Sequence, residues 1–246
     1  TDVIAMIFKA LEHAQRDFVG MVVGNDATEA FSAGANLMLV VMAAMQGDWK
    51  SLEKTINDFQ QANQLLRYSP IPVVTAPFGL TLGGGCEIAM HGAAARAHAE
   101  LYMGLVEVGV GLVPAAGGCK ESLARALGGL PDEVDPFPLV RKIFEQIGFA
   151  KISMSAEEAR SLGYLRESDT VSFNRDFLIH DAKQVALGLA RAGYRPPRPR
   201  TFRLPGSSGF ATLRSGLQML LAAHQILPHD LTVGTELARV RSEERR

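Results

Sequence analysis

Two glutamates lie in surroundings that could make their carboxyl groups useful for proton transfer. Glu107 lies in the apolar segment YMGLVEVGVGLVP, where the nearest lysine or arginine residues are Arg96 and Lys120. A carboxylate in such a segment is rarely buried without a partner or a function, and burial raises its pKa toward neutrality. Glu87 follows three glycines in the first turn of an expected helix, where acids ordinarily act as caps. Together they are candidates for paired acid–base chemistry; the alternative is a solvent-facing Glu107 and a structural Glu87.

Two glycine-bearing turns could supply backbone hydrogen-bond donors. In AFSAGANL (30–37), Gly34 allows a turn after a strand, so that the amide of Ala35 can face a cleft. In GLTLGGGCEIAMHG (79–92), Gly84 lies just before a helix, where free amide groups point outward and the helix dipole favours negative charge. Two amides that meet at one oxygen would form an oxyanion hole suited to an enolate. The alternative is that these glycines only form tight turns.

Other candidate residues indicate structure rather than chemistry. His224, His229 and Asp230 do not have the spacing of a metal site, so no metal is expected. Trp49 and the methionine-rich run around Met42 are expected in the core or in the wall of a pocket.

The elements that position these residues alternate between strand and helix and then become helical only. Short apolar runs predict strands at 18–25, 71–79 and 101–113, and apolar periodicity predicts helices at 3–14 and 51–68. After residue 176 only helical patterns follow. The expected fold class is therefore α/β with a helical C-terminal region. The basic, proline-rich segment 195–206 predicts a division into residues 1–194 and residues 195–246.

Composition excludes several classes of protein. The 246 residues include 25 lysines and arginines and 26 acidic residues, a formal net charge of -1 that argues against nucleic-acid binding through phosphate neutralisation. The longest apolar run, 37–45, is too short to cross a membrane. The two cysteines, Cys86 and Cys119, form no CxxC motif and indicate neither a disulfide framework nor a zinc module. A cytoplasmic location is expected.

The segments AFSAGANL, GLTLGGGCEIAMHG and LVEVGVGLVPAAGG, in this order and spacing, resemble the crotonase (enoyl-CoA hydratase/isomerase) superfamily. The resemblance implies a spiral of ββα units, usually assembled as trimers, and an acyl-CoA substrate. Its thioester oxygen would lie between the amides of Ala35 and Gly84. The neighbouring substrate-binding residues would be Ala33, Gly34, Gly83 and Gly85. The two glutamates of hydratases fall on Glu87 and Glu107.

The resemblance implies an enoyl-CoA hydratase, which adds water in syn geometry to a 2-trans-enoyl-CoA in fatty-acid β-oxidation. Glu107 would protonate Cα, and Glu87 would hold and activate the water. The alternatives are a Δ3-Δ2-enoyl-CoA isomerase, which often needs one carboxylate, and a catalytically silent acyl-CoA-binding or assembly domain. A nicotinamide-dependent dehydrogenase is disfavoured because the glycines read GxxxGGG rather than GxGxxG.

Departures from simple hydratases point to a larger protein. The stretch between the two glycine turns and the region 130–150 are longer, the helical tail is unusual, and the first strands of the fold are missing. These features resemble the hydratase part of a protein fused to an upstream 3-hydroxyacyl-CoA dehydrogenase. That domain would use NAD, and no cofactor is expected in this chain.

Overall fold

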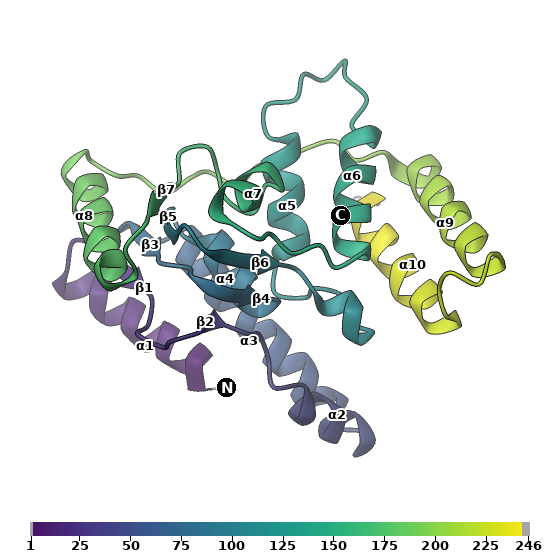
Figure 1. Ribbon diagram of the computed structural model, residues 1–246, viewed down its shortest axis with the longest axis horizontal. Coiled ribbons are helices and arrows are strands. Elements are labelled where there is room, and N and C mark those ends of the chain that lie inside the picture. Colours follow the sequence, from purple (N-terminus) through teal and green to yellow (C-terminus); the bar gives the residue numbers. More distant parts are fainter. Residues whose placement is uncertain (1, 243–246) are drawn as a thin grey trace.

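The computed structural model describes residues 2–242 of the chain (Figure 1). The elements, in chain order, are α1 (Asp2–Asp17), β1 (Met21–Val23), β2 (Ala30–Ser32), α2 (Leu37–Met45), α3 (Trp49–Arg67), β3 (Val73–Thr75), β4 (Gly79–Leu82), α4 (Gly84–His91), β5 (Ala94–His98), β6 (Leu101–Gly104), the 3-10 turn η1 (Glu107–Val110), α5 (Gly118–Leu127), α6 (Phe137–Gly148), α7 (Ala156–Ser161), β7 (Thr170–Ser172), the 3-10 turn η2 (Arg175–Phe177), α8 (Leu178–Arg191), α9 (Gly206–Ala222) and α10 (Pro228–Ser242).

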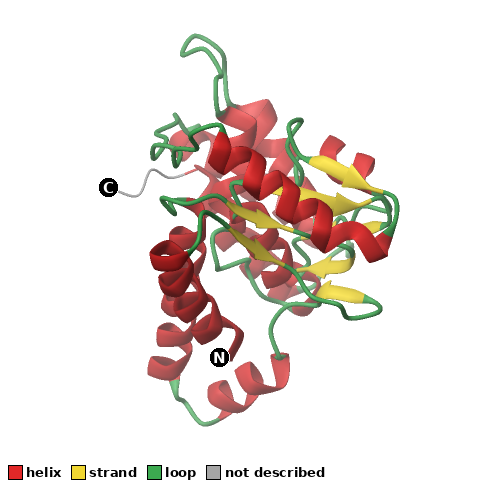
Figure 2. Cartoon of the chain, turned by 90° about the vertical axis from the view of Figure 1, so that its left-hand side faces the viewer, coloured by secondary structure: helices red, strands yellow, loops and turns green. Residues whose placement is uncertain are grey.

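The strands form two parallel sheets, between flanking helices (Figure 2). Over the described residues, one sheet has the order β1-β3-β5-β7 and the other the order β2-β4-β6. The chain alternates between the sheets, so each turn gives one strand to each sheet before a helical segment follows. This arrangement confirms the expected ββα spiral. Because parallel neighbours run in the same direction, the segments that leave β2, β4 and β6 emerge along one edge.

The core lies where the most apolar elements cross. All three residues of β3 are buried, and every residue of α4 is buried, including Glu87 and His91. A short helix that is enclosed on all sides holds its side chains in fixed positions, because close-packed neighbours leave little room for other rotamers. This rigidity matters for Glu87, which would be free to move on an exposed helix.

The predicted strand 101–113 is wrong beyond its first four residues. Strand β6 ends at Gly104, opposite Leu82, which is the last residue of its partner β4. A Cβ on Gly104 would lie 2.6 Å from the carbonyl oxygen of Lys151. After Gly104 the chain leaves the sheet, and Glu107 begins η1 instead of lying within a strand.

Two other predicted strands are shorter than expected. The run 18–25 forms only β1, whose three residues are half-buried at the edge of its sheet. The run 71–79 divides into β3 and the start of β4, which belong to different sheets. Gly79, with a φ of +49°, begins β4. The helices predicted at 3–14 and 51–68 are confirmed as α1 and α3. Helix α1 is longer at both ends, whereas α3 begins at Trp49 and ends at Arg67.

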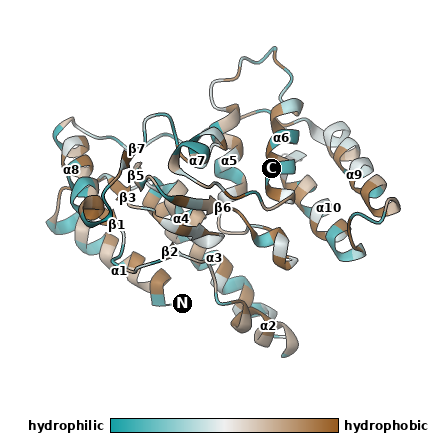
Figure 3. Cartoon of the chain, in the orientation of Figure 1, coloured by the Kyte–Doolittle hydropathy of each residue, from teal (hydrophilic) through white to brown (hydrophobic). Residues whose placement is uncertain are grey.

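The methionine-rich run does not lie in the core, and its alternative place in the wall of a pocket stays a prediction. Helix α2 has no buried residue, and it packs against α3 away from the sheets (Figures 1 and 3). The side chain of Met45 is 83% exposed and that of Trp49 is 64% exposed. Helix α2 still follows directly on the turn that contains Ala35, with Asn36 as its N-cap.

The C-terminal helices α9 and α10 pack against each other, and α10 also packs against α6 (Figure 1). Buried residues of these helices, among them Leu213 and Leu237, belong to the same hydrophobic cluster as the sheets. Residues 195–205 form no regular secondary structure. The division into 1–194 and 195–246 stays a prediction. Between residues 2 and 242, no helix combines the length and the hydrophobicity that a bilayer crossing requires.

Candidate active site

The structure brings the two glycine turns together. Strands β2 and β4 pair side by side, with Ser32 opposite Thr81. Gly34 follows β2 with a φ of +91°, a conformation that favours glycine. A Cβ on Gly34 would lie 3.3 Å from the carbonyl oxygen of Leu82 and 3.6 Å from the amide nitrogen of Gly84. The turn that contains Ala35 therefore lies directly against the turn that contains Gly84.

Each of the three glycines after β4 has a structural reason. Gly83 is the N-cap of α4 with a φ of +53°. A Cβ on Gly84 would lie 2.7 Å from Cε1 of Phe59, and a Cβ on Gly85 would lie 2.6 Å from Cβ of Ser32. Gly84 is the first residue of the helix, so its N–H has no acceptor within α4. A main-chain donor is thus held in place by close packing.

The two turns differ in their access to solvent. Ala33, Gly34 and Ala35 are exposed, whereas Gly83 and Gly84 are buried. A ligand could therefore approach from the exposed side and reach an amide group on the buried side.

Glu87 lies on α4, one turn beyond Gly83. Its side chain is 2% exposed, and its Oε1 accepts hydrogen bonds from the amides of Ala116 (2.9 Å) and Gly118 (2.8 Å). Gly118 is the first residue of α5, so its amide is one of the free donors at a helix N-terminus. Burial, followed by the charge of Glu107, raises the pKa of Glu87 to about 8, against the opposing effect of the two amides.

Glu107, at the start of η1, reaches the same glycine turn. A Cβ on Gly83 would lie 3.3 Å from Oε1 of Glu107. Among the described residues, Oε2 of Glu107 is buried and has no hydrogen-bond partner. Burial raises the pKa of Glu107 to about 7, although the backbone amides of Glu107 and Val106 act in the opposite direction.

The arrangement can support acid–base chemistry near neutral pH. Two desolvated carboxyls that interact electrostatically do not both ionise readily, so one proton is retained over the range between their two titrations. The pair then offers one carboxylic acid and one carboxylate beside the glycine turn that carries the Gly84 amide. Such a set could protonate one atom, deprotonate another and stabilise a developing oxyanion.

Other candidates do not join this group. Cys86 is fully buried, and burial raises the pKa of its thiol well above the ordinary value, as expected for a structural cysteine. Within residues 2–242, no group of three or more His, Cys, Asp or Glu residues could hold a metal ion. Nε2 of His229 instead lies 3.0 Å from the carbonyl oxygen of Gly111, which ends η1.

The residues that hold Glu87 are not predicted from the sequence. The amides of Ala116 and Gly118 come from the AAGG segment that precedes α5. A signal was present, because Gly117 and Gly118 lie directly before a helical pattern, which is typical of a site that binds an anionic group. The signal does not reveal which carboxylate would occupy that site.

Comparisons with known proteins show a family and relatives that this chain resembles. The profile of the family described as enoyl-CoA hydratase/isomerase matches residues 1–130. A probable 3-hydroxyacyl-CoA dehydrogenase of Bacillus subtilis is 41% identical over 239 residues, which cover 97% of this chain and 30% of the relative. A putative fatty acid oxidation complex trifunctional enzyme of Rickettsia felis is 32% identical over 76% of this chain and 25% of its own length. The chain therefore spans less than a third of these curated relatives.

Solved structures show the same fold. An enoyl-CoA hydratase from Geobacillus kaustophilus superposes with a TM-score of 0.62 at 20% identity, over 97% of this chain and 78% of that protein. An enoyl-CoA hydratase from Polaromonas superposes with a TM-score of 0.61 at 19% identity, over 97% of this chain and 80% of that protein. At this level of identity the likeness concerns the fold.

Proposed function

Because this chain belongs to the enoyl-CoA hydratase/isomerase family, we propose that it catalyses the syn addition of water to a 2-trans-enoyl-CoA. One observation carries the proposal. Two desolvated carboxyls, on Glu87 and Glu107, lie beside the turn that contains the Gly84 amide. Hydration needs a base for water at Cβ, an acid for Cα and donors for the thioester oxygen, and this group of residues supplies all three.

In the proposed reaction, the thioester oxygen accepts hydrogen bonds from the amides of Ala35 and Gly84. These donors stabilise the negative charge that develops on the oxygen as water attacks Cβ, and each such donor contributes about 10²–10³-fold to the rate. Ala33, Gly34, Gly83 and Gly85 form the backbone around the thioester. They are suited to this position because small residues allow close approach of the main chain.

The two carboxyls then divide the proton transfers. Glu87 takes a proton from the attacking water, and Glu107 gives its proton to Cα, so that hydroxyl and hydrogen add to the same face. The pKa of Glu87 is raised to about 8 and that of Glu107 to about 7, so the proton that the free pair retains between these values lies on Glu87. The proposed step uses the arrangement with the proton on Glu107, and the two amides at Oε1 of Glu87 favour it by stabilising the carboxylate of that residue. After product release, the proton on Glu87 is lost and Glu107 is protonated again.

A direct assay distinguishes this activity from the alternatives. A hydratase consumes crotonyl-CoA, with loss of the absorbance of the conjugated thioester. An isomerase would instead convert a 3-enoyl-CoA to the conjugated 2-enoyl-CoA without hydrating crotonyl-CoA. A silent acyl-CoA-binding domain would do neither. Absence of crotonyl-CoA hydration by a folded protein would contradict the proposal.

We also infer that the chain is the hydratase part of a fused β-oxidation protein. The support is the length of the relatives, one of which is named a probable 3-hydroxyacyl-CoA dehydrogenase. A 3-hydroxyacyl-CoA is the product of the proposed hydration, so a dehydrogenase of that class, which would use NAD, could act next. A trimer-like homo-oligomer and a cytoplasmic location remain proposals that follow from the family resemblance.

A further inference from the structure

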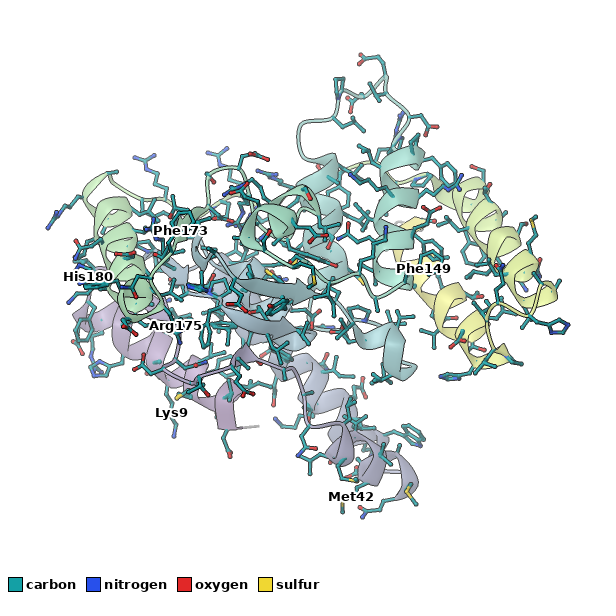
Figure 4. All side chains as sticks on the ribbon, in the orientation of Figure 1. Lys9, Met42, Phe149, Phe173, Arg175 and His180 are labelled. Carbon is teal, nitrogen blue, oxygen red and sulfur yellow. The ribbon has the colours of Figure 1, made fainter. Side chains whose placement is uncertain are left out.

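A large cavity lies between α6 and the two C-terminal helices, and we call it the hairpin cavity. Its volume is about 960 Å³, at the upper end of the range of ligand pockets. The inner wall is formed by buried apolar side chains, including Phe144, Leu213 and Leu217. The side chains of Phe149 and Met219 lie on its open side and are 62% and 73% exposed; Phe149 is labelled in Figure 4.

The hairpin cavity adjoins the turn that carries Glu107. Val108 and Gly109, the two residues that follow Glu107 in η1, are part of its wall. Helix α10 is fixed to the same turn, because His229 contacts the carbonyl oxygen of Gly111 at 3.0 Å. One face of η1 therefore bears on the glycine turn through Glu107, and the residues directly after it line the cavity.

The lining favours an uncharged, flexible occupant. The charged side chains Arg141 and Glu145 pair with each other at 2.7 Å, so their charges largely cancel. Asp230, in the first turn of α10, accepts a hydrogen bond from the amide of Leu227. Asp230 is the one charged residue of the described lining that has no ion pair, and its negative charge disfavours an anionic ligand. The exposed side chains of Phe149 and Met219 would gain from contact with an apolar chain.

We infer that the hairpin cavity holds the acyl chain of the substrate, and that this chain acts on long-chain enoyl thioesters in preference to short ones. This inference rests on the proposed function, because it places the reacting carbons at Glu87 and Glu107 and the distal methylenes beyond η1. A short substrate such as crotonyl-CoA would be held by its thioester and CoA groups alone. The distal methylenes of a longer chain would be transferred from water into the cavity.

The test compares crotonyl-CoA with 2-trans-dodecenoyl-CoA in the intact protein and in a blocked variant. Gly216 lines the cavity from α9, and a Cβ there would meet nothing within 4 Å, so Gly216→Trp fills the cavity without a backbone clash. Gly188→Trp is the matched control, since Gly188 also lies in a helix with nothing within 4 Å of its Cβ but outside the cavity. Gly148→Trp fills the same cavity from α6.

The kcat/KM of the wild-type protein should rise with chain length, by up to about fourfold for each methylene that is transferred from water into the cavity. Gly216→Trp and Gly148→Trp should lower the dodecenoyl-to-crotonyl ratio by about tenfold or more, equivalent to displacing roughly two methylenes. Their crotonyl-CoA rates should match those of the wild type, and Gly188→Trp should leave the ratio unchanged.

Equal kcat/KM for both substrates in the wild type would overturn the inference, as would a blocked variant that loses both activities in proportion while folded. Failure of the proposed function has a different signature, namely no hydration of crotonyl-CoA at all. In that case the affinities for lauroyl-CoA and butyryl-CoA, measured by calorimetry, decide the matter. Tighter binding of lauroyl-CoA that Gly216→Trp removes would support the acyl-chain site, and equal affinities would refute it. Closure of the cavity by self-association would appear as concentration-dependent mass with no chain-length effect, and would also refute it.

Discussion

Replacing Glu107 by glutamine should have opposite effects on activity and on stability. Glu107→Gln keeps the size of the side chain but removes its transferable proton. General acid–base groups contribute about 10²–10⁴-fold to enzymatic rates. This range corresponds to about 3–5 kcal/mol of activation free energy. Turnover of crotonyl-CoA should fall by a factor in this range, because the glutamine cannot protonate Cα.

The stability effect follows from the raised pKa of Glu107. Burial raises this pKa from 4.5 to about 7 in the folded protein. As the pH rises from about 4.5 to 7, the unfolded chain releases this proton while the folded protein retains it, so the free energy of unfolding decreases. The loss at pH 7 and above amounts to about 3 kcal/mol for a shift of this size. Glutamine does not ionise, so Glu107→Gln should be more stable than wild type above pH 7, with the difference disappearing near pH 4.

Both effects can be measured on the same preparations. Activity is followed by the loss of the conjugated thioester absorbance, and stability by chemical unfolding at several pH values. Glu53→Gln, at an exposed position on α3, removes the same charge outside the site and serves as control. Wild-type turnover in a folded Glu107→Gln protein would refute the assignment of the acid. A variant with no gain in stability at high pH would refute the conclusion that this carboxyl is desolvated in the fold.

Two further predictions concern the carboxyl pair and a second buried carboxylate. Hydration needs one protonated and one ionised carboxyl, and burial raises the pKa values of Glu107 and Glu87 to about 7 and about 8. We therefore expect kcat/KM to peak between these pH values and to fall on both sides. A profile that is flat from weakly acid to alkaline pH would contradict the pairing. Oε1 of Glu121 lies 3.3 Å from Arg125 and 3.6 Å from both Arg67 and Arg166, and the side chain of Glu121 is 3% exposed. Glu121→Gln should lower the free energy of unfolding by about 3–5 kcal/mol, because the three guanidinium groups lose their shared carboxylate. An unfolding midpoint equal to that of wild type would argue against this network.

The glycine turns were predictable because their signals are local. Free amides arise where a strand is followed, within a few residues, by a glycine and by the beginning of a helix. In the structure, Gly34 and Gly83 adopt positive-φ conformations at these positions. That the two turns would meet depends on the pairing of β2 with β4, which the sequence suggests only through family resemblance. Glu107 illustrates the limit. Its apolar surroundings predict a strand, but β6 ends where its partner β4 ends, and the glutamate lies on a 3-10 turn.

By itself, the sequence determined the helix positions, the glycine turns and the two unusual glutamates, since each depends on neighbours along the chain. Only the tertiary structure decided how those glutamates titrate. The groups that bury Glu87, the charge of Glu107 that raises its pKa and the Gly118 amide that opposes this rise are all distant from Glu87 in sequence. It also decided that α2 is exposed and that α9 and α10 leave a cavity beside η1. A pattern of apolar residues shows which face of a helix avoids water, but it does not show which partner covers that face or how completely.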